Sequence, residues 1–251
     1  TYEHRLYESL SKTPAQQYVP RSLDFGQSGD YRFLIMTLGG KDLTSIVDRY
    51  TSHEKLGIFR SLIQALRAFH DTGVVHRDIK PRNVLLKIGG AKTDILLIDL
   101  GLAKRYALCG MHGPNCRKTS TVGTSRYASV HAQMFVQSGR RDDMYSAVYT
   151  MVSVFGRRLP WEGLKGDAKT KAAETLRRKR LLPPSVVCRG CPPCVARVAQ
   201  HVQQLRFAER PPYELIIRLI ELDMPVTQII PPTSSILCPA GGPLMMPPPA
   251  P

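Results

Sequence analysis

Hydrophobic positions recur at spacings of three and four along residues 54–70. Residues at these spacings lie on one face of an α-helix, so the stretch predicts a long helix packed against the core. Residues 2–10 predict a shorter amphipathic helix, because Leu6 and Leu10 lie four positions apart. The apolar positions of the longer stretch are Leu56, Phe59, Leu62, Ile63, Leu66 and Phe69.

Three apolar runs have the length of strands rather than helices. The run "YRFLIMTL" at 31–38 predicts a buried strand, which ends at the following "GGKD". Two shorter runs, 84–86 and 95–99, are separated by a Gly-Gly pair and predict a hairpin. Residues 104–127 are polar and without periodicity, which is typical of a long functional loop.

Helical spacing returns in the second half of the chain, at 142–156, where we expect the helix to end at Pro160. Further helices are expected near 167–180, 193–205 and 212–222. Beyond residue 224 the chain is rich in proline and low in charge, so it buries little and predicts a disordered or polyproline-like tail. The expected organisation is one α+β domain over 1–222 and a tail over 223–251.

The composition narrows the class of partner. Of 251 residues, 43% are hydrophobic, and 35 Lys and Arg face 20 Asp and Glu, a net charge of +15. Such an excess favours polyanions or acidic proteins without choosing between them. No apolar run approaches the roughly 18 residues of a membrane span. We expect an intracellular protein, cytoplasmic or nuclear or both, with reduced cysteines and no membrane association.

Residues 76–83, "HRDIKPRN", contain the groups that phosphoryl transfer needs. Asp78 is the carboxylate that orients an attacking hydroxyl, and Lys80 is the cation for the γ-phosphate. Asn83, five residues after Asp78, is a candidate Mg²⁺ ligand. Asp99, in the "IDLG" sequence 16 residues further on, is the candidate main Mg²⁺ carboxylate. The predicted hairpin between Asn83 and Asp99 brings both metal ligands to one end of a sheet.

The alternative is that these four polar residues merely occupy surface loops. Their order, followed by "GTSRY" at 123–127, favours the catalytic interpretation. The segments "HRDIKPRN", "LIDLGLAKRY", "GTSRYASV", "GRRDDMYSAVY" and "RLPWEGLK" together resemble the casein kinase 1 group, which includes the tau-tubulin kinases. Ala128, Ser129 and Val130 stand where that group has a Ser-Ile-Asn-like triplet and most kinases have Ala-Pro-Glu. The similarity runs from about residue 2 to 222.

The resemblance implies a protein serine/threonine kinase that uses ATP and Mg²⁺ and prefers acidic or already phosphorylated protein substrates. It assigns Glu3 as the helix-C glutamate that pairs with the ATP-anchoring lysine. It assigns Met36 as the gatekeeper, and Leu38 and Gly39 as the hinge that hydrogen-bonds adenine. Asn83 and Asp99 complete the nucleotide site through the metal.

The resemblance also assigns residues around the catalytic loop. Asp143 matches the helix-F aspartate that holds the backbone of this loop, and His76 matches a packed structural histidine. Arg77 and Arg126 match a basic pocket that faces the activation segment and binds a substrate anion. Thr119 stands where the family often has a lysine of this pocket, and we expect the adjacent Lys118 to contribute the charge there.

Two departures from the family pattern bear on activity. Leu100 replaces the usual Phe of Asp-Phe-Gly, which an apolar slot tolerates. The family's glycine-rich loop and anchoring lysine lie upstream of the helix-C glutamate, and nothing of that length precedes Glu3. We therefore expect a protein kinase-like fold that is mostly the helical C-lobe, with an N-lobe remnant from helix C to the hinge. We expect this N-terminally truncated chain to be inactive by itself.

Smaller features have two interpretations each. Cys188, Cys191 and Cys194 have the spacing of a metal or redox site, but free thiols are the simpler interpretation. The basic run 176–180 predicts either a nuclear-localisation or anion-binding patch, or the solvated end of a helix.

The rival function is a catalytically inactive kinase-like fragment or pseudokinase that acts as a binding scaffold. A nucleic-acid binder has only the net charge in its favour, because no nucleic-acid motif is present. We expect a monomer.

Overall fold

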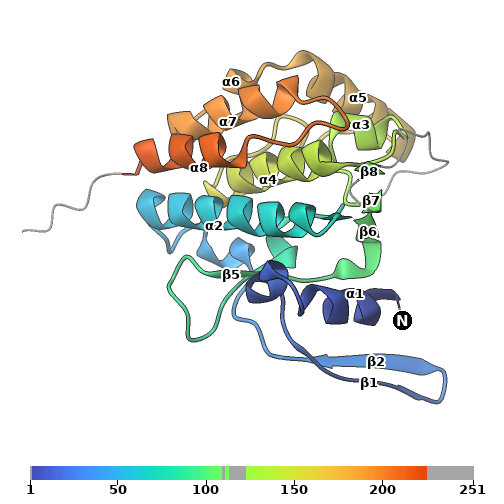
Figure 1. Cartoon of the computed structure of the whole chain (residues 1–251). Helices are drawn as coiled ribbons and strands as arrows, with labels where there is room; N and C mark the ends of the chain where they lie inside the picture. Colours follow the sequence, from blue (N-terminus) through green and yellow to red (C-terminus); the bar gives the residue numbers. More distant parts are fainter. Residues whose placement is uncertain (1, 109–110, 113–122, 225–251) are drawn as a thin grey trace, which may run out of the picture.

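The computed structural model describes residues 2–108, 111–112 and 123–224. Figure 1 shows the helices α2, α4, α7 and α8 stacked together, with the β1–β2 hairpin and α1 on the opposite side of α2. This arrangement agrees with the predicted α+β class. The helices are α1 (Tyr2–Leu10), α2 (Ser52–Asp71), α3 (Val130–Gln133), α4 (Arg140–Val154), α5 (Ala168–Leu181), α6 (Pro184–Val187), α7 (Pro193–Gln204) and α8 (Tyr213–Leu222).

The strands are short and pair in twos among the described residues. All four pairs are antiparallel: β1 with β2, β3 with β6, β4 with β5 and β7 with β8. Their bounds are β1 (Ser22–Ser28), β2 (Tyr31–Met36), β3 (Val74–Val75), β4 (Val84–Leu86), β5 (Ile95–Leu97), β6 (Lys104–Arg105), β7 (Ala107–Leu108) and β8 (Met111–His112). Short 3₁₀ turns connect them at η1 (Pro14–Tyr18), η2 (Leu43–Ile46), η3 (Pro81–Asn83) and η4 (Leu100–Leu102).

Helix α2 forms the centre of the core, as its periodicity predicts. It begins at a capping box, in which the Thr51 side chain accepts from the Glu54 backbone and the Glu54 carboxylate accepts from the Thr51 backbone. Phe59, Leu62 and Leu66 are fully buried. The helix packs against α4 and α8, so it supports both the catalytic loop that follows it and the C-terminal helices.

The hairpin predicted between Asn83 and Asp99 is confirmed. Strand β4 pairs with β5 so that Val84 lies opposite Leu97. In an antiparallel pair the start of one strand meets the end of the other. The residues that flank the hairpin at this end are therefore Asn83 and Asp99, and the backbone N–H of Ile98 donates to the Asn83 carbonyl at 3.0 Å.

The prediction of a buried strand at 31–38 is wrong about burial. Strand β2 forms there, but Tyr31 is 81% exposed and Ile35 is 47% exposed. Its partner β1 was not predicted from the sequence. Within the described part of the chain β2 pairs with β1 alone, so its alternate side chains remain in solvent.

Two further predictions need correction at their boundaries. Helix α4 ends at Val154 rather than at Pro160, and Gly156 then adopts a φ of 72° that favours glycine. The stretch 104–127 is not loop throughout, because β6, β7 and β8 occupy its first part. Residues 109–110, 113–122 and 225–251 lie outside the described residues, so of the predicted tail the structure describes Asp223 and Met224 alone. In the described part of the chain no helix is both long and apolar enough to cross a membrane.

Candidate active site

Asp78, the acidic residue of the loop that follows β3, accepts hydrogen bonds at both carboxylate oxygens. One carboxylate oxygen, Oδ1, accepts from the backbone N–H of Thr124 at 2.8 Å and from its hydroxyl at 2.9 Å. The other, Oδ2, accepts from Lys80 Nζ at 2.5 Å. Burial opposes ionisation of this carboxyl, but the bonds from Lys80 and Thr124 outweigh it and hold the pKa of Asp78 below its ordinary value. Asp78 is therefore a buried, ionised carboxylate with a fixed orientation.

Asn83 joins Asp78 to Asp99. Its side-chain amide donates to the Asp78 carbonyl at 3.0 Å, to Asp78 Oδ2 at 3.2 Å and to Asp99 Oδ2 at 3.4 Å. Asp99 has a left-handed backbone, with φ at 65°, where β5 gives way to η4. The predicted catalytic and metal-binding residues thus meet at the open end of the β4–β5 hairpin.

These residues fit a magnesium ion by their chemistry. Mg²⁺ prefers carboxylate and amide oxygens, and here two carboxylates and one amide lie within hydrogen-bonding reach of one another. Asp99 is exposed, whereas Asp78 and Asn83 are buried beneath it. The Asp99 carboxylate is open to solvent, and the hydrogen bonds to Asp78 hold Asn83 in place beside it.

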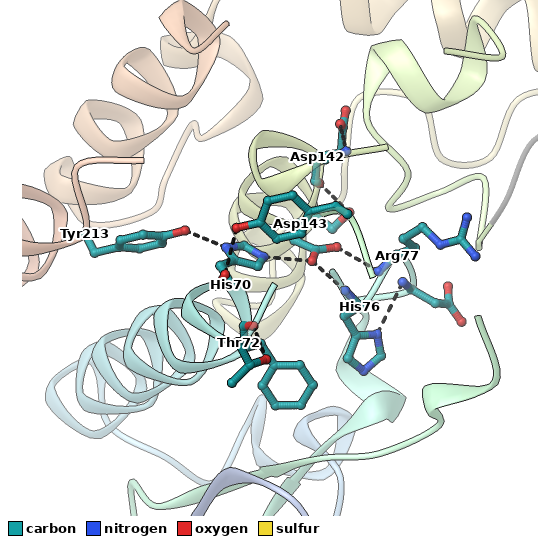
Figure 2. Close-up of polar contacts among 12 residues, drawn as sticks. His70, Thr72, His76, Arg77, Asp142, Asp143 and Tyr213 are labelled. Atoms are coloured by element: carbon teal, nitrogen blue, oxygen red, sulfur yellow. Dashed lines mark hydrogen bonds and ion pairs between the residues drawn. The ribbon is translucent and has the colours of Figure 1, made fainter. Parts of the chain in front are cut away.

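Asp143, at the start of α4, holds the backbone of the catalytic loop (Figure 2). Its Oδ2 accepts the backbone N–H of His76 at 2.7 Å, and its Oδ1 accepts that of Arg77 at 2.8 Å. Burial opposes ionisation of Asp143, but the bond from His70 and those from the backbone hold its pKa below the ordinary value. Arg77 has a φ of 70°, and these bonds stabilise that left-handed conformation just before Asp78.

His76 is fully buried, in the position expected of a packed histidine. Its Nε2 lies 3.1 Å from the carbonyl oxygen of Ile98, and the N–H of Asp78 donates to its Nδ1 at 3.4 Å. Burial lowers its pKa, so the ring is neutral, with Nε2 the donor and Nδ1 the acceptor. His76 thereby links the catalytic loop to the segment between β5 and η4 that contains Asp99.

Glu3 lies on α1 next to the Asp99 segment. Its Oε1 accepts the backbone N–H of Leu100 at 3.0 Å. Burial raises the pKa of Glu3, and the nearby Asp99 charge adds to this effect. Leu100, which replaces the usual phenylalanine, is fully buried, so an apolar slot accepts it.

The predicted gatekeeper, Met36, is the last residue of β2, and the predicted hinge residues, Leu38 and Gly39, follow it directly. Met36 packs against the edge of the core. Leu38 is 83% exposed. A Cβ atom on Gly39 would approach Leu85 Cδ1 to 2.5 Å, so a side chain there would displace Leu85. Glycine at this position allows the main chain to run directly against β4.

Of the predicted anion pocket, the structure describes Arg77 and Arg126. The Arg77 side chain donates from Nε to the Leu102 carbonyl at 2.6 Å, so part of its guanidinium is engaged by the protein. The side chain of Arg126 is 54% exposed, and its guanidinium lies 3.9 Å from Glu162. Lys118 lies outside the described residues.

Two residues missed by sequence reasoning support this site, Thr124 and Lys179. Lys179 is 7% exposed, and its Nζ donates to the carbonyls of Ser125 at 2.8 Å and Ala128 at 2.7 Å. It anchors the segment whose Thr124 bonds Asp78. The interpretation of 176–180 as a solvated helix end is therefore wrong for Lys179. No local sequence signal distinguishes Lys179 from the exposed basic residues beside it, because its burial depends on how α5 packs.

The three spaced cysteines are free thiols. Cys188 and Cys194 are buried, and burial raises the pKa of each to about 12. Cys191 is half-buried, and burial raises its pKa to about 11. Over the described residues no three His, Cys, Asp or Glu side chains gather as metal ligands.

An α+β fold that brings a carboxylate, a lysine and two oxygen ligands together has the arrangement of a phosphotransferase. Residues 3–218 match the family model of the protein kinase domain. The chain belongs to the protein kinase domain family. Membership supports kinase activity on protein substrates, with ATP and a divalent metal as cofactors.

Proposed function

We propose that this protein is a serine/threonine kinase of the casein kinase 1 type. It transfers the γ-phosphate of ATP to Ser or Thr of acidic or pre-phosphorylated proteins. The observation that carries the proposal is the hydrogen-bonded set of Asp78, Lys80, Asn83 and Asp99. In this proposal residues 1–222 form the kinase domain. The helices from α2 onward form its C-lobe, and α1, β1 and β2 belong to its N-lobe.

Asp78 is proposed to orient the substrate hydroxyl and to accept its proton. Its ionisation at neutral pH follows from the bonds that lower its pKa. Lys80, which is bound to Asp78 in this structure, would offset charge on the transferred phosphoryl group. Asn83 and Asp99 would hold the metal, and bound Mg-ATP supplies the phosphoryl group and the charge neutralisation.

The nucleotide base is proposed to bind at the turn after β2. The backbone of Leu38 and Gly39 would hydrogen-bond adenine, and Met36 would bound the pocket as gatekeeper. The close approach of Gly39 to Leu85 supports a main-chain role at this turn. Glu3 would pair with a cation that anchors the α- and β-phosphates, and its position beside Asp99 supports this role.

The substrate preference is proposed to come from Arg77, Lys118 and Arg126. The exposed guanidinium of Arg126 supports recognition of an anion on the substrate, because a planar guanidinium grips phosphate with two hydrogen bonds. The net charge of +15 supports acidic partners in general.

The direct test measures phosphate transfer from radiolabelled ATP by the full-length protein to Ser, Thr and Tyr peptides. Asp78→Asn is expected to lower the rate about a hundredfold or more, the contribution of a positioned acid–base group. Asp30→Asn, which changes a carboxylate in the turn between β1 and β2, is the matched control. Near wild-type turnover by Asp78→Asn, or transfer to Tyr alone, would overturn the proposal.

The second candidate is a kinase-like binding scaffold. One observation favours it, since the Glu3 carboxylate accepts from the Leu100 backbone, where an active kinase pairs this glutamate with lysine. Calorimetric titration of the full-length protein with Mg-ATP, run beside the transfer assay, separates the two. Nucleotide binding with transfer supports the kinase, whereas the absence of transfer with intact folding supports the scaffold.

A further inference from the structure

His70, in the last turn of α2, has a hydrogen-bond partner on each ring nitrogen (Figure 2). Its Nδ1 lies 2.5 Å from the hydroxyl of Tyr213, the first residue of α8. Its Nε2 lies 3.0 Å from Asp143 Oδ2. Tyr213 and Asp143 are fully buried, and the His70 side chain is too. Three helices thus meet through one imidazole.

The direction of each bond follows from which groups hold protons. The ionised Asp143 carboxylate can only accept, so His70 Nε2 holds the ring proton and donates to it. Nδ1 of the ring then presents its lone pair. The Tyr213 hydroxyl, whose pKa burial raises, keeps its proton and donates to Nδ1.

Asp143 connects the hydrogen-bonded His70 ring to the catalytic loop. The Oδ2 atom that accepts from His70 also accepts the N–H of His76, and Oδ1 accepts the N–H of Arg77. Arg77 immediately precedes Asp78 and has a left-handed backbone. An unbroken series of hydrogen bonds therefore joins the first turn of α8 to the peptide that orients Asp78 (Figure 2).

We propose that Tyr213 is a positioning residue for phosphoryl transfer, which acts by holding His70 in the Nε2–H tautomer. Without the hydroxyl, one of the two bonds that keep the proton on Nε2 is lost, and only the bond to Asp143 remains. In the fraction of molecules whose proton moves to Nδ1, Nε2 turns a lone pair toward Asp143, and this carboxylate loses one of its three donors. The catalytic role rests on the function proposed above, whereas the tautomer is a property of the fold alone.

Tyr106 offers a matched control in the same cluster. Its hydroxyl donates to the backbone carbonyl of His70 at 2.7 Å, and the residue is buried. Tyr106→Phe and Tyr213→Phe each remove one buried hydroxyl bonded to His70 and keep the ring. Only Tyr213→Phe removes a bond to the imidazole.

The first experiment records ¹⁵N–¹H correlations of the histidine side chains in the full-length protein. In the wild type and in Tyr106→Phe, His70 is expected to show the Nε2–H pattern. In Tyr213→Phe its signals should move toward the other tautomer or toward a mixture. An unchanged Nε2–H pattern in Tyr213→Phe would overturn the proposal, whatever the activity of the protein.

The second experiment measures amide hydrogen exchange at His76 and Arg77, together with steady-state kinetics. Tyr213→Phe should speed exchange at these two amides about tenfold while amides in the middle of α2 exchange as before. It should also lower kcat about tenfold at unchanged KM for ATP, with Tyr106→Phe within about twofold of wild type. Faster exchange spread evenly over α2 and α8 would show a general packing defect and overturn the proposal.

The exchange and tautomer measurements need no catalysis. If the full-length wild-type protein transfers no phosphate, the proposed function fails, and these two measurements still decide whether Tyr213 positions the loop.

Discussion

Thr124 donates two hydrogen bonds to one carboxylate oxygen of Asp78, from its backbone N–H at 2.8 Å and from its hydroxyl at 2.9 Å. The two residues lie 46 positions apart in the chain. Thr124 also accepts from Lys80 Nζ at 3.2 Å, so its hydroxyl bridges the carboxylate and the lysine of the candidate site. The segment that begins at Gly123 is therefore held to the loop after β3 by the carboxylate that we propose orients the substrate hydroxyl.

Thr124→Val tests this relationship, because it removes the hydroxyl and keeps the shape and the backbone bond. Loss of one hydrogen bond to a charged group corresponds to about 1.5–3 kcal/mol, so kcat/KM is expected to fall at least about tenfold. The pKa of Asp78 should rise toward its ordinary value, because one of the bonds that lower it is gone. The acid limb of the profile of kcat/KM against pH should therefore move to higher pH.

Thr124→Ser retains the hydroxyl and is the control for this measurement. It should keep both the rate and the position of the acid limb close to the wild type. An equal fall of kcat/KM in the serine and valine variants would mean that the Thr124 hydroxyl does not support catalysis.

Lys179→Met tests the anchor of the 123–130 segment. Methionine fills the buried space but leaves the Ala128 carbonyl without its donor, and the Ser125 carbonyl keeps only the bond from Gln133 at 3.4 Å. An orphaned buried carbonyl costs about 1–3 kcal/mol, and the contact of Nζ with the Trp161 ring, 4.9 Å away, is also lost. Urea unfolding should show a lower free energy of unfolding. Arg180→Met, at the exposed neighbouring position, should change it little.

The pH dependence of stability gives a second measurement on Lys179. Burial lowers its pKa to about 7, whereas an unfolded lysine titrates near about 10.4. Between these values the unfolded chain binds more protons, so this group makes the folded protein more stable as the pH rises. The stability of the wild type relative to Lys179→Met should therefore increase from about pH 7 toward pH 10. A difference independent of pH would contradict the assignment of a buried, titrating amine.

Asp143→Asn tests the carboxylate that holds the catalytic loop. The amide has one acceptor oxygen where the carboxylate has two, so at least one buried donor among His70, His76 and Arg77 loses its partner. A loss of about 1–3 kcal/mol per unpaired donor is expected in denaturant unfolding. Asp71→Asn, at a half-exposed carboxylate on the same helix as His70, is the control.

The acid side of the stability curve should also change in Asp143→Asn. The pKa of Asp143 is depressed in the folded state, so its contribution is fully present above the ordinary aspartate value of about 3.9. That contribution is lost as the pH falls through the lower folded pKa. In Asp143→Asn, the free energy of unfolding should therefore fall less steeply as the pH drops through this range. An unchanged slope below about pH 4 would mean that Asp143 does not titrate as described.

Arg126→Ala tests the proposed preference for phosphorylated substrates. The comparison uses a phosphorylated peptide and its unphosphorylated twin with the full-length protein. Loss of a charge-assisted contact of about 1.5–3 kcal/mol should reduce the preference in kcat/KM at least about tenfold. Arg177→Ala, which removes an exposed arginine paired with Glu174, should leave the preference intact. A preference that survives Arg126→Ala and Lys118→Ala together would exclude this pocket.

The sequence by itself determined the features that depend on near neighbours in the chain. The three- and four-residue spacing of 54–70 determined α2, because that spacing defines a helix face. The two apolar runs around a Gly-Gly turn determined the β4–β5 hairpin and, through it, the meeting of Asn83 with Asp99. The residues that meet in these elements are close together in the chain, so their contacts do not depend on how distant segments pack.

Only the tertiary structure decided the features that depend on distant partners. The burial of Lys179 in a basic run, the exposure of Ile35 in an apolar one and the bond of Thr124 to Asp78 have no local signal. His70 and Tyr213 lie 143 positions apart, and their contact exists because α2 and α8 pack side by side. Burial and long-range hydrogen bonding depend on which faces of the helices and strands pack together. The residue type at one position does not specify which distant residue will lie against it.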